Sequence, residues 1–274
     1  MNRIPRVIAI NDMSGFGRCS LTTAIPVLSV LGVQCCPLPT AILSCHTGFE
    51  NFTFQDLTEI LPQYLSNWKS NGFEFDCVYS GFLGSYEQIE ITSNLIKSFN
   101  KNILCVVDTV MGDHGKIYST YTPEMCNGMK NLISHADVIT PNITEACYLS
   151  GVEYKGENIS KHQATEIAKK LCDMGATSTV ITGIDDGKTL SNFVYKNNIS
   201  TLISTPKSKK VFSGTGDLFA SIVTGMLLNN NCLEKSVEVA SDFIYHCIEY
   251  TIQLNSPISE GVVFEPLLKN LGAN

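Results

Sequence analysis

The stretch ILCVVDTVMGD, residues 103–113, joins an unbroken apolar run to two acidic residues. The run Ile103–Val107 predicts a strand buried on both faces, as strands are in a parallel sheet covered by helices. Asp108 and Asp113 follow it, and open α/β sheets bind ligands just beyond the carboxyl ends of their strands. The two acids are therefore candidate site residues, although a solvated acidic loop would show the same pattern.

Strands and helices alternate on both sides of this stretch. The predicted strands are Arg6–Ile10, Val33–Leu38, Asp76–Ser80 and Asp137–Thr140. The predicted helices are Ser20–Leu31, Leu57–Trp68, Gln88–Phe99 and one that starts at Ser160, with Gln163 in a capping box, and stops at Gly175. This alternation predicts an α/β fold with a central, mostly parallel sheet and helices on both faces.

The pattern changes in the last third of the chain. Thr179–Ile184 and Leu190–Tyr195 flank a turn that contains Gly187, which predicts a hairpin, and Ile199–Ser204 continues it as an antiparallel edge. From Gly214 onward the pattern is helical nearly to the end. Since no linker or repeat intervenes, residues 1–274 are expected to form a single domain.

The composition narrows the class of protein. The 274 residues are 44% hydrophobic, and the net charge of −7 argues against nonspecific binding to nucleic acid or anionic membranes. The eleven cysteines include no C-x-x-C pair, which disfavours a zinc site and fits reduced thiols. With neither a signal peptide nor an apolar run of about 20 residues, a cytoplasmic protein is expected. Lys207, Lys209 and Lys210 form either a solvated loop or a phosphate-facing one.

Two glycine-rich segments match nucleotide-binding motifs incompletely. Residues 14–20 place Ser20 where the dinucleotide fingerprint needs its third glycine, and no acid follows about 20 residues later to bind the ribose. Gly183 and Gly187 are separated by three residues where a Walker A motif needs four. A dehydrogenase and a P-loop enzyme are therefore disfavoured.

A third segment, Ser213–Asp217, opens the apolar run Leu218–Leu228. A glycine-rich turn at the start of a helix presents free N–H groups and the positive end of the helix dipole, which bind anions. A carboxylate beside an anion site suits phosphoryl transfer to an alcohol, because Asp217 can take the hydroxyl proton. The alternative is that Asp217 is only a helix-start residue stabilised by the same dipole.

This segment resembles the signature of the ribokinase-like superfamily, and within it the chain is similar to the pyridoxal kinases and the hydroxymethylpyrimidine kinases. Asp217 matches the catalytic base, and Gly214, Thr215 and Gly216 match the anion hole. Four further segments occur in the expected order along nearly the whole chain. They are Ser44–Gly48, Ser80–Gly84, Asp108–Asp113 and Thr140–Glu145. The resemblance implies a ribokinase-like fold and an ATP-dependent kinase.

The resemblance also implies which residues bind the nucleotide and its metal ion. The positions implied for ATP are Asp108, Asp113, Asn142, Thr182 and Gly183. Glu145 is implied to organise Mg²⁺, often through water. Asn142 and Glu145 also have capping-box spacing, so a helix cap is an alternative role that can hold at the same time. Thr109 stands where the family usually has proline.

For the acceptor, the resemblance implies a pocket formed by three parts of the chain. His46 and Thr47 match polar positions that meet the ring substituents, and Asp12 matches a position facing a polar edge of the ring. Phe82 matches an aromatic position that stacks on a flat ring. The alternatives are a structural histidine and a core phenylalanine.

The favoured function is an ATP-dependent kinase that phosphorylates the 5′-hydroxymethyl group of pyridoxal, pyridoxine and pyridoxamine. The alternative enzyme is a hydroxymethylpyrimidine kinase of thiamine synthesis, and the loop Ser44–Gly48 favours vitamin B6. A non-enzymatic vitamin-binding protein is expected to lose the base or the anion hole, and both are present. The resemblance implies a homodimer and Mg²⁺, and it leaves open whether a monovalent cation such as K⁺ is required.

Overall fold

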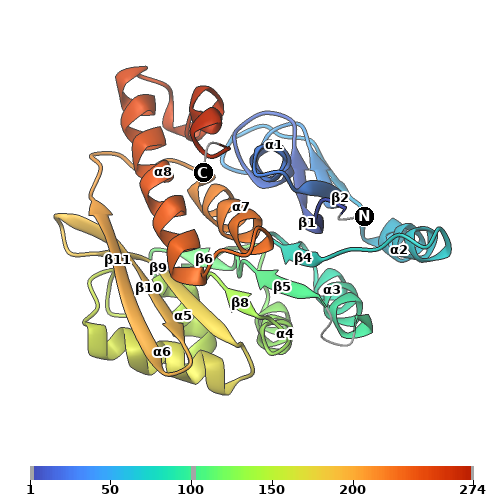
Figure 1. Cartoon of the computed structure of the whole chain (residues 1–274), viewed down its shortest axis with the longest axis horizontal. Coiled ribbons are helices and arrows are strands. Elements are labelled where there is room, and N and C mark those ends of the chain that lie inside the picture. Colours follow the sequence, from blue (N-terminus) through green and yellow to red (C-terminus); the bar gives the residue numbers. More distant parts are fainter. Residues whose placement is uncertain (1–2, 100–102, 273–274) are drawn as a thin grey trace.

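The computed structural model describes residues 3–99 and 103–272 and joins nine strands in one sheet (Figure 1). These strands are β1 (Arg6–Ser14), β2 (Gln34–Leu43), β3 (Phe54–Asp56), β4 (Cys77–Ser80), β5 (Leu104–Val107), β8 (Val138–Ile139), β9 (Ser178–Asp185), β10 (Thr189–Lys196) and β11 (Ile199–Pro206). Their order across the sheet is β11-β10-β9-β8-β5-β4-β1-β2-β3. A separate hairpin consists of β6 (Gly112–Asp113) and β7 (Lys116–Ile117).

Parallel pairing dominates the middle of the sheet. β2, β1, β4, β5, β8 and β9 pair in parallel, and β10 and β11 extend the sheet antiparallel beyond β9. These pairings confirm the predicted sheet and its antiparallel edge. At the other edge β3 pairs antiparallel with β2. This strand gave no signal in the sequence, because its three residues are all exposed and form no apolar face.

Helices cover both faces of the sheet. They are α1 (Ser20–Val30), α2 (Leu61–Ser70), α3 (Tyr86–Ser98), α4 (Pro123–Ile133), α5 (Ile143–Ser150), α6 (Lys161–Asp173), α7 (Thr215–Leu228) and α8 (Leu233–Gln253), with 3₁₀ turns at Thr58–Ile60, Ile258–Glu260 and Glu265–Asn270. α1, α7 and α8 pack on one face and α2 to α6 on the other (Figure 1). Within the two described ranges, no helix is both long and apolar enough to cross a membrane.

Alternate residues of each central strand feed two separate cores. In β1, Val7 and Ala9 belong to the core with α1, α7 and α8, whereas Ile8 and Ile10 belong to the opposite core. All four side chains are at most 1% exposed. Burial on both faces explains why these strands form continuous apolar runs in the sequence.

The capping box predicted at Ser160 starts α6. The Oγ of Ser160 accepts the N–H of Gln163 at 3.2 Å, and the Oε1 of Gln163 accepts the N–H of Ser160 at 2.9 Å. Gly175 follows the helix at φ 123°, where a side-chain carbon would lie 2.6 Å from the carbonyl oxygen of Ser134. Both the turn and the packing therefore require glycine.

The topology brings several loops to one edge of the sheet. β1, β4, β5 and β8 are parallel neighbours, so their carboxyl ends point the same way. Gly81, Asp108 and Thr140 directly follow three of these strands. The amino end of α7 reaches the same edge, where Asp217 contacts Asn11 of β1.

Candidate active site

Asp217 lies in the first turn of α7, just after a glycine that the fold requires. Gly214 caps the helix at φ 78°, and a side-chain carbon there would lie 1.8 Å from the carbonyl oxygen of Arg18. The first N–H groups of a helix lack partners within it, so this turn is suited to hold an anion. The structure thus places Gly214, Thr215 and Gly216 around the start of α7, next to Asp217.

The carboxylate of Asp217 is suited to accept a proton. Its Oδ1 accepts a 2.9 Å hydrogen bond from the Nδ2 of Asn11. Burial, together with the charge of Asp12, raises the pKa of Asp217 to about 6. Hydrogen bonds from the Ser20 backbone and from Asn11 act in the opposite direction and lower this pKa. A carboxyl group with this pKa is ionised at neutral pH and is a better base than an ordinary aspartate.

Asn11 was not singled out from the sequence. Its side chain is fully buried, and its Oδ1 accepts the N–H groups of Asp12 and Phe82, both at 2.9 Å. It therefore joins Asp217 to the loop after β4. The signal available in the sequence is only a polar residue that directly follows an apolar strand.

Asp108 is brought next to the start of α7. Its Oδ1 accepts a 2.8 Å hydrogen bond from the hydroxyl of Thr140, and its Oδ2 lies 3.9 Å from the place of a side-chain carbon at Gly216. Burial, followed by the charges of Glu145 and Asp217, raises the pKa of Asp108. Like charges in a buried site favour the binding of a cation, which relieves their repulsion.

Four hydrogen bonds occupy both carboxylate oxygens of Glu145. Oε1 accepts the N–H groups of Met111 at 2.8 Å and Gly112 at 3.5 Å. Oε2 accepts the hydroxyl of Thr109 at 2.8 Å and the N–H of Asn142 at 3.0 Å. Burial raises the pKa of Glu145, and these bonds oppose the rise. The reciprocal bond from the N–H of Glu145 to the Oδ1 of Asn142 completes a capping box, so the cap role is confirmed.

Three of the residues implied for the nucleotide, Asn142, Thr182 and Gly183, lie beside one another on β9 and the loop after β8. Asn142 and Thr182 form a β-bridge, and the N–H of Thr182 donates to the carbonyl of Pro141 at 2.9 Å. Gly183, at φ 79°, donates its N–H to the Oδ1 of Asn192 at 3.3 Å. Asn192, on β10, thus holds the backbone of Gly183 in place, and nothing in the sequence indicated this role.

Asp113 lies in a different environment from Asp108. It is exposed on β6, where its Oδ1 accepts the N–H of His114 at 2.8 Å. The ring nitrogens of His114 lie 3.6 Å from carboxylate oxygens of Asp113 and of Glu157. These three side chains are close enough to share a metal ion, although all of them are at least partly exposed to solvent.

Tyr118, just after β7, is another residue that the sequence did not indicate. Partial burial of its phenol, followed by the charges of Glu145 and Asp113, raises its pKa. Its N–H donates to the carbonyl of Met111 at 2.9 Å, so it belongs to the loop that surrounds Glu145. A single tyrosine in an irregular loop has no periodic pattern by which it can be recognised.

The three lysines of the basic cluster before α7 do not share one environment. Lys207 forms a 2.6 Å ion pair with Asp185, whereas Lys209 and Lys210 are exposed. The segment 183–189, which partly matches a Walker A motif, lies around the turn between β9 and β10. The antiparallel pairing of these strands confirms the predicted hairpin.

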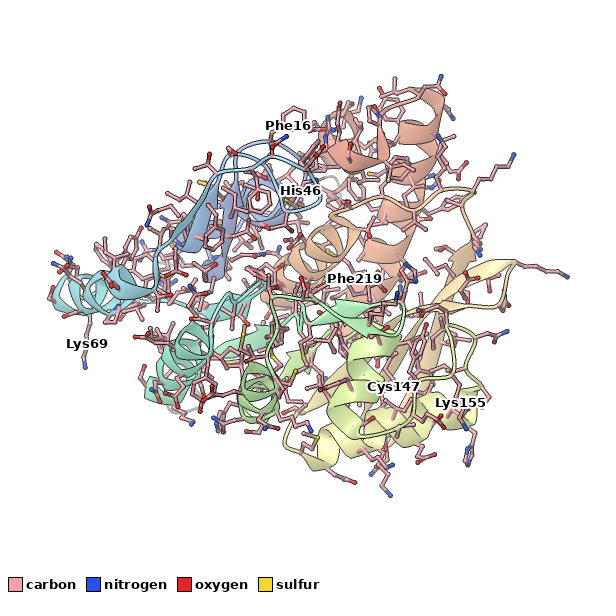
Figure 2. The ribbon with its side chains drawn as sticks, turned by 180° about the vertical axis from the view of Figure 1, so that it is seen from behind. Phe16, His46, Lys69, Cys147, Lys155 and Phe219 are labelled. Carbon is pink, nitrogen blue, oxygen red and sulfur yellow. The ribbon has the colours of Figure 1, made fainter. Side chains whose placement is uncertain are left out.

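His46 uses both ring nitrogens within the protein. Its Nδ1 accepts the N–H of Gly48 at 3.1 Å, so its Nε2 carries a proton and donates to the carbonyl of Ser259 at 2.7 Å. Its ring lies 4.7 Å from that of Phe49, which contacts Phe16 at 5.6 Å between ring centres. Figure 2 shows Phe16 and His46 at the same end of the molecule. His46 therefore fixes the loop that carries the exposed Thr47.

Asp12 and Phe82 lie near the carboxyl ends of β1 and β4. Asp12 is 7% exposed and accepts hydrogen bonds from the hydroxyls of Ser14 and Ser20. Phe82 is half-buried, and among the described residues it is not part of either hydrophobic core. Its ring is therefore available to stack on a flat ligand.

The donor atoms around α7 suit a hard cation. Asp108 and Glu145 supply carboxylate oxygens, and Mg²⁺ prefers oxygen ligands and keeps several waters. Because the oxygens of Glu145 are already hydrogen-bonded, contact through water fits this residue better than direct coordination. The residues present therefore fit Mg²⁺ near Asp108.

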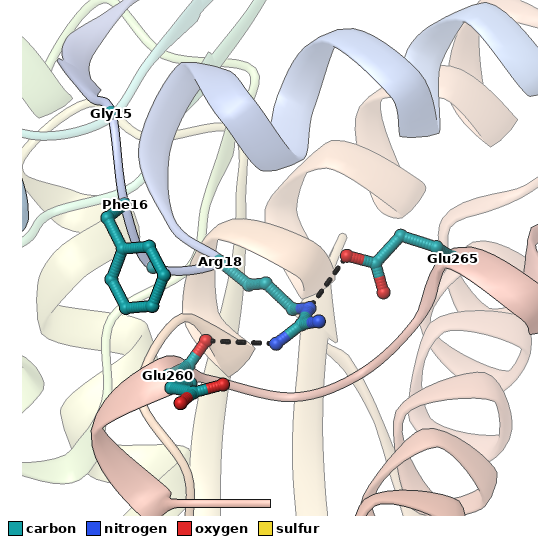
Figure 3. Close-up of a pocket in the computed structure, with 6 residues that line it drawn as sticks. Gly15, Phe16, Arg18, Glu260 and Glu265 are labelled. Carbon is teal, nitrogen blue, oxygen red and sulfur yellow. Dashed lines mark hydrogen bonds and ion pairs between the residues drawn. The ribbon is translucent and has the colours of Figure 1, made fainter.

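A pocket of about 220 Å³ lies at the loop between β1 and α1 (Figure 3). It is lined by Gly15, Phe16, Gly17, Arg18, Glu260 and Glu265. Arg18 is paired there, through its Nε to Glu265 at 2.7 Å and its Nη1 to the carbonyl of Glu260 at 3.3 Å. None of the candidate site residues lines this pocket, but it adjoins the site, because Gly17 packs against His46 and the Arg18 carbonyl against Gly214.

The family of phosphomethylpyrimidine kinases matches residues 22–261 of the chain. The chain is also 30% identical over 266 residues to a pyridoxal kinase from Pasteurella multocida, a match that covers 90% of this chain and 89% of the relative.

Two solved structures are similar throughout. One is a protein from Bacteroides thetaiotaomicron named as a phosphomethylpyrimidine kinase, with 38% identity, a TM-score of 0.95, and coverage of 98% of this chain and 94% of the other. An orthorhombic crystal form of that protein was obtained with pyridoxal. The other is a pyridoxal kinase from Lactobacillus plantarum, with 27% identity, a TM-score of 0.91, and coverage of 99% and 98%.

Proposed function

The chain belongs to the phosphomethylpyrimidine kinase family, and we propose that it is an ATP-dependent pyridoxal kinase. It transfers the γ-phosphoryl group of ATP to the 5′-hydroxymethyl group of pyridoxal, pyridoxine or pyridoxamine. The observation that carries this proposal is the carboxylate of Asp217, with its raised pKa, beside the free N–H groups at the start of α7. Relatives named pyridoxal kinases and a related structure with pyridoxal support the choice of vitamin B6 as acceptor.

Asp217 acts as the general base in this reaction. Its carboxylate accepts the proton of the acceptor hydroxyl as the oxygen attacks the γ-phosphorus, the bond from the γ-phosphorus to the β,γ-bridging oxygen breaks, and ADP leaves. The N–H groups at Gly214, Thr215 and Gly216 hold the transferring phosphoryl group and offset its charge. In a loose transition state a correctly placed weak base is sufficient.

The nucleotide lies between the start of α7 and the edge formed by β8 and β9. Asn142, Thr182 and Gly183 contact it there, with Asp113 at the outer end. Asp108, and Glu145 through water, would hold Mg²⁺, which supplies positive charge against the phosphates. The carboxylate of Asp217, and not the metal ion, accepts the proton of the acceptor hydroxyl.

The acceptor ring lies on the side of β1 and β4. Phe82 stacks on its face, and Thr47 and Asp12 meet its polar substituents, while His46 holds the loop of Thr47 in place. We further propose that the chain forms a single domain, assembles as a homodimer and is located in the cytoplasm. The molar mass of the purified protein, measured by light scattering, tests whether it is a dimer.

A turnover assay tests the proposed function. Purified protein, ATP and Mg²⁺ are incubated with each of the three B6 vitamers and, in parallel, with hydroxymethylpyrimidine. We expect kcat/KM to be higher for at least one B6 vitamer than for hydroxymethylpyrimidine. Hydroxymethylpyrimidine is the alternative acceptor, and a higher kcat/KM for that compound would overturn the choice of vitamin B6.

A further inference from the structure

Asn11 links the two halves of the site. We propose that Asn11 is a positioning residue that holds the carboxylate of Asp217 and couples it to the acceptor-side loop at Phe82. This inference rests on the proposed function, in which Asp217 is the base. The two residues are 206 positions apart in the sequence, so only the fold brings them together.

The hydrogen bonds fix which way the Asn11 amide points. Its Oδ1 accepts two N–H groups, from Asp12 and from Phe82, each at 2.9 Å. Since N–H groups require an acceptor, the oxygen must face them and the NH₂ group must face Asp217. The NH₂ group of Asn11 therefore donates to Asp217, and this hydrogen bond stabilises the ionised form of the carboxylate.

The surroundings enclose the Asn11 amide closely. Asn11 is fully buried, and a side-chain carbon at Gly81 would lie 2.2 Å from the Nδ2 of Asn11. The glycine that follows β4 is therefore required by this amide. Three segments, the end of β1, the loop after β4 and the first turn of α7, meet at one side chain.

Among the titratable groups near Asp217, Asp12 acts on it by charge and raises its pKa. The charge of Asp217 in turn raises the pKa of Cys19, Tyr79, Asp108 and Tyr118. Asn11 is the neighbouring side chain that donates to Asp217, and the Ser20 backbone adds a second donor. Removal of the Asn11 donor therefore raises the pKa of the base.

Asn11→Asp separates the two contacts of this residue. The new carboxylate still accepts the N–H groups of Asp12 and Phe82, but it repels Asp217. A like charge at this distance raises the pKa of the base by about two units, which lowers kcat at pH 7 about tenfold. We expect the acid limb of the pH–rate profile to move up accordingly, kcat to recover at higher pH, and the KM for pyridoxal to stay near the wild-type value. Asn131→Asp, which adds the same charge on the exposed surface of α4, should leave the profile unchanged.

A second measurement does not depend on turnover. In the double variant Asn11→Asp with Asp217→Asn, donor and acceptor are exchanged, so the hydrogen bond can form again. We expect Asn11→Asp alone to lower the melting temperature at pH 7 and the double variant to restore it, even if Asn11→Asp alone does not fold. A double variant no more stable than Asn11→Asp, or an unshifted acid limb, would overturn the proposal. If the wild type phosphorylates none of the B6 vitamers, the proposed function fails, while the melting data still decide the role of Asn11.

Discussion

Asp217 and Glu145 are both acids near the same edge of the sheet, but their surroundings differ. Glu145 is 3% exposed and accepts four hydrogen bonds that occupy both of its oxygens. Asp217 accepts bonds from Asn11 and from the Ser20 backbone, and lies beside the anion site. A carboxylate that binds many donors holds loops together, whereas one with few donors keeps the capacity to take a proton. Glu145 is therefore suited to order the loops around the metal position, and Asp217 is suited to take the proton.

The largest expected effect is on turnover by Asp217→Asn. The substitution preserves shape but removes the proton acceptor, so kcat should fall about 10²–10⁴-fold. ATP binding, measured by calorimetry, should remain. Asp173→Asn is the matched control, because Asp173 is exposed at the end of α6. Near-normal turnover would show that Asp217 is only a helix-start residue.

The pKa of Asp217 also predicts how stability depends on pH. Its pKa is about 6 in the folded protein, above the ordinary 3.8, so the folded state holds this proton more tightly. The free energy of unfolding therefore falls as pH rises from about 4 to 6, by up to about 3 kcal/mol, and the contribution is lost above that range. Asp217→Asn should be more stable than the wild type at pH 7 and equally stable near pH 4. Urea titrations of both proteins at pH 7 and pH 4 measure their free energies of unfolding. If the variant differs from the wild type by the same free energy at both pH values, the raised pKa of Asp217 is contradicted.

Glu145→Gln should have the opposite effect on stability. The new NH₂ group must face two of the four donors around Glu145, which leaves buried N–H or O–H groups without an acceptor. We expect a loss of about 2 kcal/mol at pH 7, together with a higher Mg²⁺ concentration for half-maximal turnover. Glu166→Gln on the exposed face of α6 is the control. An unchanged stability would mean that the hydrogen bonds to Glu145 are not required for the fold.

The smallest expected effect concerns Thr109. Its hydroxyl donates to Glu145 at 2.8 Å from a fully buried position. Thr109→Val should cost about 1.5 kcal/mol and leave the acid limb of the pH–rate profile in place. Thr165→Val, on the surface of α6, controls for loss of a hydroxyl. A shifted acid limb would place Thr109 in contact with the base instead.

Local patterns predicted most of the fold and part of the site. The apolar runs, the capping boxes at Ser160 and Asn142, and the glycine turn before Asp217 all depend on neighbours within a few residues. Asn11 and the donors around Glu145 could not be predicted, because their partners come from distant segments that only the sheet topology brings together. For the same reason the sequence left open whether His46 meets the acceptor or has a structural role, and the structure binds its ring nitrogens to Gly48 and Ser259.

The most direct test compares Asp217→Asn with Glu145→Gln at pH 7, with turnover and melting temperature measured on the same preparations. We expect Asp217→Asn to raise the melting temperature while turnover nearly disappears. We expect Glu145→Gln to lower the melting temperature while the folded protein still turns over at high Mg²⁺ concentration. If both substitutions lower the melting temperature and Asp217→Asn keeps wild-type turnover, Asp217 is not the base.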